Sequence, residues 1–165
     1  MKKTLLLIAL LSVALCGMAQ KKSSFPFKGG VEHMMAFFKD SLIVSQDIIQ
    51  RKASGTVTFK FSADALGRVS KIVLYYADDA VLAQPAADAL KRSGGKWDIP
   101  VGTASNDYLI TFSFNFIPPA AAGVDLVNAV YDYSVNHRPI TFPNQFLMEN
   151  GILLPTVAVN YDIPQ

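Results

Sequence analysis

Hydrophobic and polar residues alternate along two stretches of this chain. Residues 55–62 place Val57, Phe59 and Phe61 on one side, with threonine and lysine on the other. Residues 108–116 repeat the pattern, with a tyrosine, an isoleucine and three phenylalanines facing one way. A period of two is typical of a strand that buries one face and exposes the other. The sequence therefore predicts two half-buried β-strands.

A third strand is predicted between these two. Residues 64–67 offer turn chemistry, because the glycine at position 67 can adopt a positive φ. Residues 69–76 are rich in the β-branched and aromatic side chains that strands favour. We therefore expect the first two strands to form a hairpin and the strand at 108–116 to close the sheet.

Two further segments have the composition and spacing of helices. Residues 31–39 carry apolar side chains about one turn apart, and residues 80–92 are rich in alanine and leucine, although Pro85 is unfavourable inside a helix. From residue 118 onward the chain is apolar, poor in charge and interrupted by prolines. We expect an α+β fold: a small antiparallel sheet of about three strands, two helices packed on one face, and an irregular C-terminal extension.

The N-terminus has the pattern of a secretory signal peptide. A basic start at residues 1–4 precedes an apolar run at 5–15 and a small-x-small sequence ending at Ala19. We expect cleavage between Ala19 and Gln20, and a periplasmic mature protein without a membrane span. Two alternatives stay open: an uncleaved membrane anchor, although the run is shorter than the ~20 residues of a spanning helix, and a lipidated Cys16.

These boundaries give the expected organisation of the 165 residues. Residues 1–19 form the signal peptide, 20–24 a short polar lead-in, 25–117 one folded domain, and 118–165 an extension that packs on or beside it. Cleavage leaves 13 of the 15 basic residues against 13 acidic ones, so the mature chain is formally neutral. A nucleic-acid binder would need a clustered basic face, which this balance does not favour.

No group of residues has the pattern of a catalytic or metal site. His33 lacks a second histidine one helical turn away, and His137 has only sequence neighbours as candidate partners. Asp78 and Asp79 are expected to cap a helix and not to bind a cation, since hard cations need several converging oxygens. We therefore expect no enzyme, no cofactor and no metal.

A series of motifs follows in order between residues 25 and 117: Phe27-Lys-Gly-Gly30, the strand Gly55-x-Val57-x-Phe59-x-Phe61, Gly67-Arg-Val69, the alanine-rich helix, Trp97-Asp-Ile-Pro100, and the strand Ile110-Thr-Phe-Ser-Phe114. This order resembles the C-terminal domain of the TonB family of energy transducers in Gram-negative envelopes. The resemblance implies a small antiparallel sheet with two helices on one face. It also implies that the domain grips a short segment of an outer-membrane transporter by adding it as a strand at the sheet edge.

The resemblance implies that residues 108–116 form the edge that accepts the partner. The predicted partner-binding residues are Tyr108, Ile110, Thr111, Phe112, Ser113, Phe114 and Asn115, with Trp97 nearby as an exposed anchor or, alternatively, as a plug of the core. The predicted partners are protein segments such as transporter N-termini. Because no long Pro-rich spacer is found, we expect a periplasmic binding domain and not a complete transducer.

The extension leaves other functions open. Residues 124–133 are expected to be helical, and residues 153–161 to form a strand interrupted at Pro155. Val157–Tyr161 can lie on the sheet edge and cover it, which would make the domain self-inhibited or purely structural. Donating this strand to a neighbour would give a homodimer. A pocket between extension and sheet would instead hold a small apolar ligand.

Overall fold

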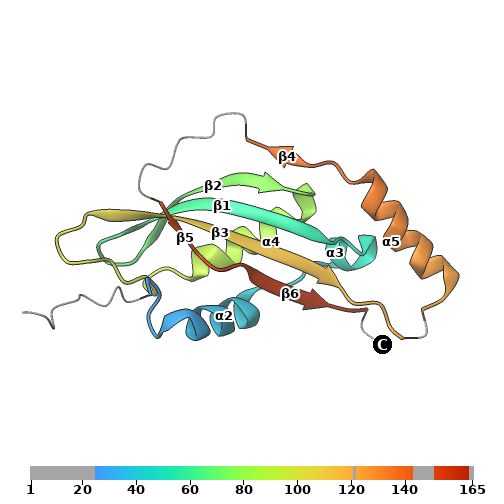
Figure 1. Cartoon of the computed structure of the whole chain (residues 1–165), viewed down its shortest axis with the longest axis horizontal. Helices are drawn as coiled ribbons and strands as arrows, with labels where there is room; N and C mark the ends of the chain where they lie inside the picture. Colours follow the sequence, from blue (N-terminus) through green and yellow to red (C-terminus); the bar gives the residue numbers. More distant parts are fainter. Residues whose placement is uncertain (1–24, 121, 143–150, 164–165) are drawn as a thin grey trace, which may run out of the picture.

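The computed structural model describes residues 25–120, 122–142 and 151–163 (Figure 1). Its elements are α2 (Gly30–Ser41), α3 (Gln46–Arg51), β1 (Gly55–Asp64), β2 (Val69–Ala77), α4 (Ala80–Arg92), β3 (Ser105–Phe116), α5 (Val124–Asn136), β4 (Ile140–Thr141), β5 (Ile152–Leu153) and β6 (Val157–Tyr161). The predicted signal peptide, its cleavage site at Ala19 and Gln20, and Cys16 lie outside the described residues.

The fold is α+β, as expected, but the sheet is larger than predicted. Six strands pair in the order β4-β2-β1-β3-β5, with β6 also beside β3. The prediction of about three antiparallel strands is therefore wrong. The sheet is mixed, because β1 runs antiparallel to β2 and β3 whereas β5 and β6 run parallel to β3. The additional strands come from the extension, which was expected to be irregular.

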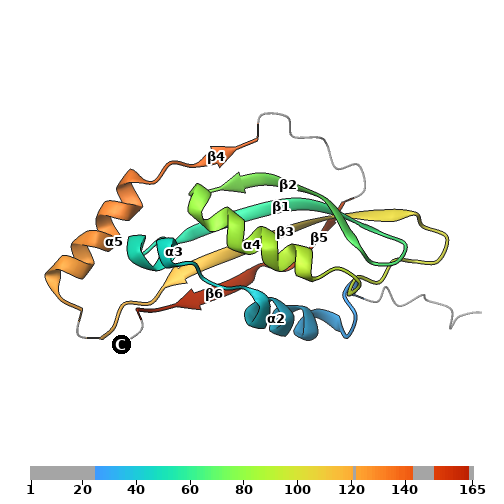
Figure 2. The same ribbon diagram turned by 180° about the vertical axis from the view of Figure 1, so that it is seen from behind.

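The helices are divided between one face and one end of the sheet. Helices α2, α3 and α4 lie on a single face (Figure 2), and α5 lies at one end, next to α3. The prediction of two helices on this face is therefore wrong, because three helices lie there. Helix α4 continues through Pro85 and buries Leu82, Ala86, Ala89 and Leu90 on its inner side. Its first turn is capped by Asp79, whose carboxylate accepts a hydrogen bond from the Val81 amide at 3.0 Å.

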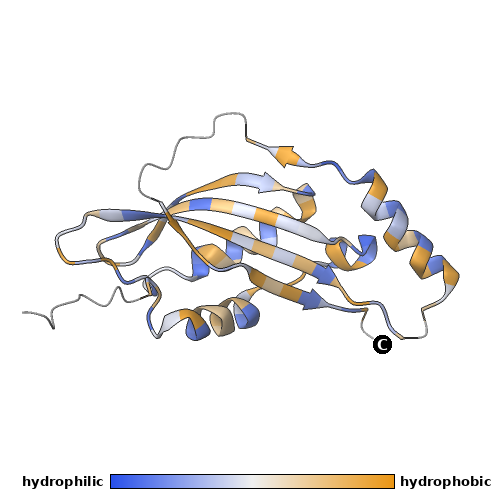
Figure 3. Ribbon diagram, in the orientation of Figure 1, coloured by the Kyte–Doolittle hydropathy of each residue, from blue (hydrophilic) through white to orange (hydrophobic). Residues whose placement is uncertain are grey.

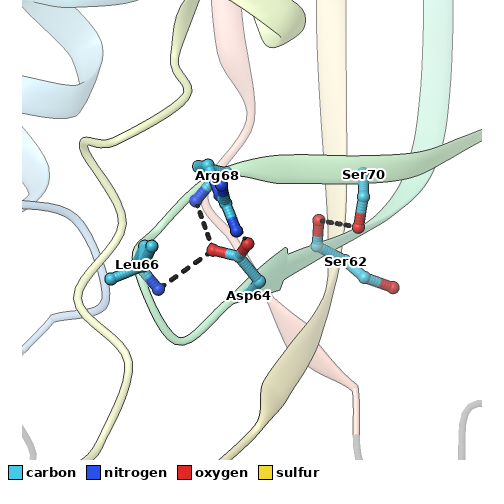
Figure 4. A network of polar contacts seen from close by, with 5 residues as sticks. All are labelled: Ser62, Asp64, Leu66, Arg68 and Ser70. Atoms are coloured by element: carbon cyan, nitrogen blue, oxygen red, sulfur yellow. Dashed lines mark hydrogen bonds and ion pairs between the residues drawn. The ribbon is translucent and has the colours of Figure 1, made fainter.

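The turn between β1 and β2 is held by one carboxylate. Asp64 Oδ1 accepts hydrogen bonds from the amides of Leu66 and Arg68, both at 2.9 Å, and Oδ2 pairs with Arg68 Nε at 2.7 Å (Figure 4). These hydrogen bonds lower the pKa of Asp64, and the bond from the Arg68 amide has the largest effect. Gly67 completes the turn with φ +74°, a conformation that other residues rarely adopt. The turn predicted at 64–67 is confirmed.

Aromatic side chains fill the core near Phe27, just before the start of α2. Trp97 lies among Phe27, Phe61 and Tyr108, with ring centroids 4.9–5.1 Å apart. Its indole N–H donates to Ser93 Oγ at 2.9 Å, so its polar atom is satisfied inside the core. A β-bridge between Phe27 and Trp97 ties the start of the domain to this cluster.

Candidate functional site: the groove beside β3

Strand β3, predicted to be the open edge, is paired on both sides. On one side it pairs with β1 from Gly55↔Phe114 to Asp64↔Ser105. On the other side it pairs with β5, at Tyr108↔Ile152 and Leu109↔Leu153, and with β6, from Phe112↔Val157 to Phe116↔Tyr161. The prediction that residues 108–116 form a free edge is therefore wrong. The alternative that Val157–Tyr161 covers this edge is confirmed.

The covering strand belongs to what we call the tail segment, residues 151–163, which packs against β3, α2 and the end of α3. We call the place that it occupies the tail groove. Val157, Val159 and Tyr161 point into the core and are 1%, 9% and 8% exposed, whereas the residues between them are exposed. Leu154 precedes them, is buried, and donates its amide to Leu109 O at 2.9 Å. The tail groove thus receives an extended chain through its backbone and through alternate side chains.

Tyr161 makes the deepest polar contact of the tail segment. Its hydroxyl group donates to Ala53 O at 2.7 Å and approaches Ile48 O at 3.3 Å. Its backbone carbonyl accepts from the Ile117 amide at 2.8 Å, and its ring packs 5.5 Å from Phe116. Burial raises the pKa of the Tyr161 phenol to about 12. One residue thereby connects the tail segment to β3 and to the end of α3.

The two acceptor carbonyls are positioned by the C-terminus of α3. Helix α3 ends where Lys52 takes a left-handed conformation, with φ 54°. The chain then turns so that the Ala53 amide donates to Ile48 O at 3.0 Å. This turn directs the Ala53 carbonyl toward the groove. Backbone acceptors of this kind leave no signal in the sequence, and sequence reasoning did not find them.

The residues predicted to bind a partner fall into two sets. Tyr108, Ile110, Phe112 and Phe114 are buried against the helices, so they could present only their backbone to an added strand. Thr111, Ser113 and Asn115 lie on the opposite face, which none of the helices in the described ranges covers (Figure 1). Asn115 hydrogen-bonds the tail with its side chain, donating from Nδ2 to Asn160 Oδ1 at 3.0 Å. The Thr111 hydroxyl is instead hydrogen-bonded to the hydroxyl of Thr58 in the neighbouring strand β1, at 2.9 Å.

Trp97 is not an exposed anchor. Its side chain is 1% exposed and is enclosed by the aromatic cluster at the far end of the core. The alternative that it plugs one end of the helix–sheet core describes its position. The partner-binding role predicted for Trp97 would require an accessible indole, which this packing does not provide.

The opposite edge of the sheet is poorly suited to accept a strand. Among the described residues β2 pairs outward only with β4, at Tyr76↔Thr141 and Ala77↔Ile140. Lys71, in the remaining part of β2, has φ 49°, and the register with β1 shifts between Lys60 and Ser62. A bulge and an edge lysine are common protections against unwanted pairing. The tail groove is therefore the better candidate site.

Other polar groups serve the fold. Asp78 accepts from the amide and hydroxyl of Thr56, at 2.5 and 3.0 Å, and from the Tyr76 hydroxyl. Burial raises the pKa of Asp78, but these bonds and the charge of His137 outweigh it and hold the pKa below its usual value. The His137 ring stacks on Tyr133, and His33 contacts Gly29 O at 2.6 Å. In the described part of the chain no three acidic, histidine or cysteine side chains are grouped to hold a metal.

Two of the hollows among the described residues lie beside the helices and the tail groove. One of about 390 Å³ lies between α3 and α4, next to Ile43, Pro85 and Arg92. One of about 160 Å³ lies at the end of the tail groove, next to Ile117, Asn160, Tyr161 and Asp162. The smaller hollow has more polar than apolar lining, so it does not resemble the mostly apolar pockets that hold small ligands.

A scan against protein-family models, a search of curated proteins and a search of solved structures each give no match. The resemblance to the TonB C-terminal domain therefore stays a prediction from the motifs. In the ranges that the structure describes, no helix is both long and apolar enough to cross a membrane.

Proposed function

We propose that this protein is an envelope protein-binding domain that takes an extended segment of a partner as an added strand beside β3. The observation that carries the proposal is the tail segment itself. It lies parallel to β3 over the five residue pairs from Phe112↔Val157 to Phe116↔Tyr161, with alternate side chains in the core. This is the geometry of strand addition, in which main-chain hydrogen bonds give affinity and side-chain pockets give selectivity.

A partner would bind by replacing the tail segment. Leu154, Val157, Val159 and Tyr161 are buried, and burial stabilises each side chain by roughly 1.5–3 kcal/mol. Leaving the groove empty would therefore be costly, whereas filling it with another segment of the same pattern would restore most of that free energy. The tail is tethered, so it competes at an effective concentration on the order of millimolar. The intact chain is thus a self-inhibited binder.

The family resemblance suggests where such partners are found. It points to the periplasm and to segments at the N-termini of outer-membrane transporters. This part of the proposal rests on the motifs between Phe27 and Phe114, because the tail groove by itself selects a strand and not a named protein.

A second candidate is a purely structural role for the tail segment. It is favoured by the two hydrogen bonds that fix Tyr161 to the end of α3. In that case the tail is a permanent strand of the sheet, and nothing replaces it.

The two candidates are separated by loosening the tail in the full chain. Tyr161→Ala removes the deepest anchor, and Leu153→Ala is the matched control, because Leu153 lies in the same tail segment with a side chain that is 73% exposed. Peptides from transporter N-termini are added to the ¹⁵N-labelled proteins, and amide shifts are followed. We expect shifts along residues 108–116 in Tyr161→Ala at peptide concentrations that leave the Leu153→Ala spectrum unchanged. A Tyr161→Ala spectrum that is folded and unresponsive would contradict the proposal and favour the structural role.

A further inference from the structure

We infer that the tail groove selects segments of the form apolar-x-apolar-Asn-Tyr, running parallel to β3, from a second protein that competes with the tail segment. The inference rests on the proposed function and deepens it, because it names the class of partner that the groove takes. The tail segment supplies the pattern, with Val157, Val159, Asn160 and Tyr161 at the four specified positions.

The two apolar positions are set by the core beneath β3. Val157 lies opposite Phe112 and Val159 opposite Phe114, and both phenylalanines are buried. Helix α2 packs against β6 from below and places Phe38 edge-on to Phe112, with ring centroids 5.2 Å apart. A polar side chain at either position would be buried without a partner in this layer.

The tyrosine position is set by two backbone carbonyls. The hydroxyl of Tyr161 reaches Ala53 O and Ile48 O at the bottom of the groove. Phenylalanine would fill the same space but leave the Ala53 carbonyl without this donor. A buried acceptor without a donor is unfavourable, so the groove distinguishes tyrosine from phenylalanine.

Direction and the position before tyrosine are set by contacts at the end of β3. The Ile117 amide donates to Tyr161 O, which places the tyrosine beside the end of β3 and fixes a parallel orientation. Asn160 accepts from the Asn115 side chain on the face that the helices leave open. An amide side chain at this position therefore pairs with Asn115.

The test uses the full chain with a protease site inserted next to Arg138, which is exposed in the loop between α5 and β4. Cutting there frees the end of the chain from its tether while every native side chain of the groove is kept. A fluorescent peptide of residues 151–163 is then bound to the cut protein, and unlabelled peptides compete with it. Tyr161→Ala in the uncut chain serves as a second preparation if the cut protein does not stay folded.

Three competitors read the pattern. The native peptide is the reference. A peptide in which residues 157 and 158, and residues 159 and 160, exchange places has the same composition but turns both valines outward; we expect it to compete at least about tenfold more weakly. The Tyr161→Phe peptide loses only the hydroxyl group, and we expect a loss of about three- to tenfold.

The outcomes separate the inference from the proposal beneath it. Equal competition by the exchanged peptide would overturn the pattern while leaving strand addition standing. Equal competition by the Tyr161→Phe peptide would overturn the tyrosine position. Failure of the native peptide to bind either folded preparation would overturn the inference together with the proposed function.

Discussion

Single residues hold the tail segment in the tail groove, and Tyr161 is the clearest example. Its phenol has a pKa raised from 10.0 to about 12 by burial, so the neutral form is favoured in the folded protein. The contribution to stability is complete below pH 10 and is lost as the pH rises from 10 to 12, because the unfolded chain ionises first. Tyr161 therefore acts as an alkaline-sensitive anchor of β6.

Tyr161→Phe tests this anchor. At pH 8 we expect the variant to unfold with a free energy about 0.5–1.5 kcal/mol lower than wild type, because a hydrogen bond is lost. Between pH 10 and 12 the difference should shrink and then reverse, since phenylalanine does not ionise. Urea unfolding at pH 8, 10 and 11 measures this. Other tyrosines titrate in both proteins and cancel in the comparison; a gap that is the same at every pH would contradict the assignment.

Gly67 is a second residue at which both the backbone conformation and the space around it require glycine. A Cβ at this position would lie 2.4 Å from Trp97 O, a backbone atom that cannot move away easily, and φ is +74°. We expect Gly67→Ala to lower the free energy of unfolding by at least about 2 kcal/mol. Gly102→Ala is the control, with φ +88° and nothing within 4 Å, and should cost about 1 kcal/mol. Chemical denaturation of the two variants checks this, and equal losses would count against the steric argument.

At the scale of elements, α5 and β6 differ in how firmly they are held. Helix α5 carries both hydrophobic and hydrophilic residues (Figure 3), and none of its described residues is buried. Its inner stripe of Leu126, Val130 and Tyr133 is only partly covered. Strand β6, although shorter, buries three of its five residues. The extension is therefore tightly packed in β6 and loosely packed in α5.

Two substitutions measure this difference. Leu154→Ala, next to β6, should lower the free energy of unfolding by about 2–5 kcal/mol, because a fully enclosed side chain leaves a cavity. Val130→Ala in α5 should cost less than about 1 kcal/mol, since the site is partly solvated. Urea midpoints of the two variants decide it; losses of similar size would show that α5 is as well packed as the tail.

Most elements were predictable from local pattern, but their partners were not. The strands expected at 55–62, 69–76 and 108–116 correspond to β1, β2 and β3, and the helix at 80–92 to α4. The strand expected at 153–161 with a break at Pro155 corresponds to β5 and β6. Alternation shows that a segment is extended and has one buried face. It does not show which strand lies beside it, so alternation cannot test the open edge that the family resemblance implies for residues 108–116.

At the scale of the whole molecule, the extension passes around the sheet. From the end of β3 it forms α5, pairs through β4 with β2, and returns as β5 and β6 beside β3 (Figure 1). Both sides of the three-stranded centre are therefore contacted by one continuous part of the chain. Such a path brings residues far apart in sequence together, as in the bond between Tyr161 and Ala53.

Amide hydrogen exchange should differ between the well-packed strands β3 and β6 and the loosely packed helix α5. We expect the amides of β3 and β6 to exchange only on global unfolding and those of α5 to exchange through local opening, because regions with few buried contacts open at lower cost. Native-state exchange followed by mass spectrometry or NMR gives the opening free energies. Protection in α5 equal to that in β6 would contradict the loose packing of α5.

Where the chain is helical or extended, which faces are apolar and where turns occur can be predicted from the sequence, because these features depend on neighbouring residues and on intrinsic backbone preferences. The folded structure is needed to show that β6 lies beside β3, that Trp97 is enclosed, and that two carbonyls near α3 receive Tyr161. These contacts join residues distant in sequence through backbone atoms that every residue has. Local pattern therefore offers Val157–Tyr161 only as one possible cover of the edge, and the folded structure shows that this strand occupies the place beside β3.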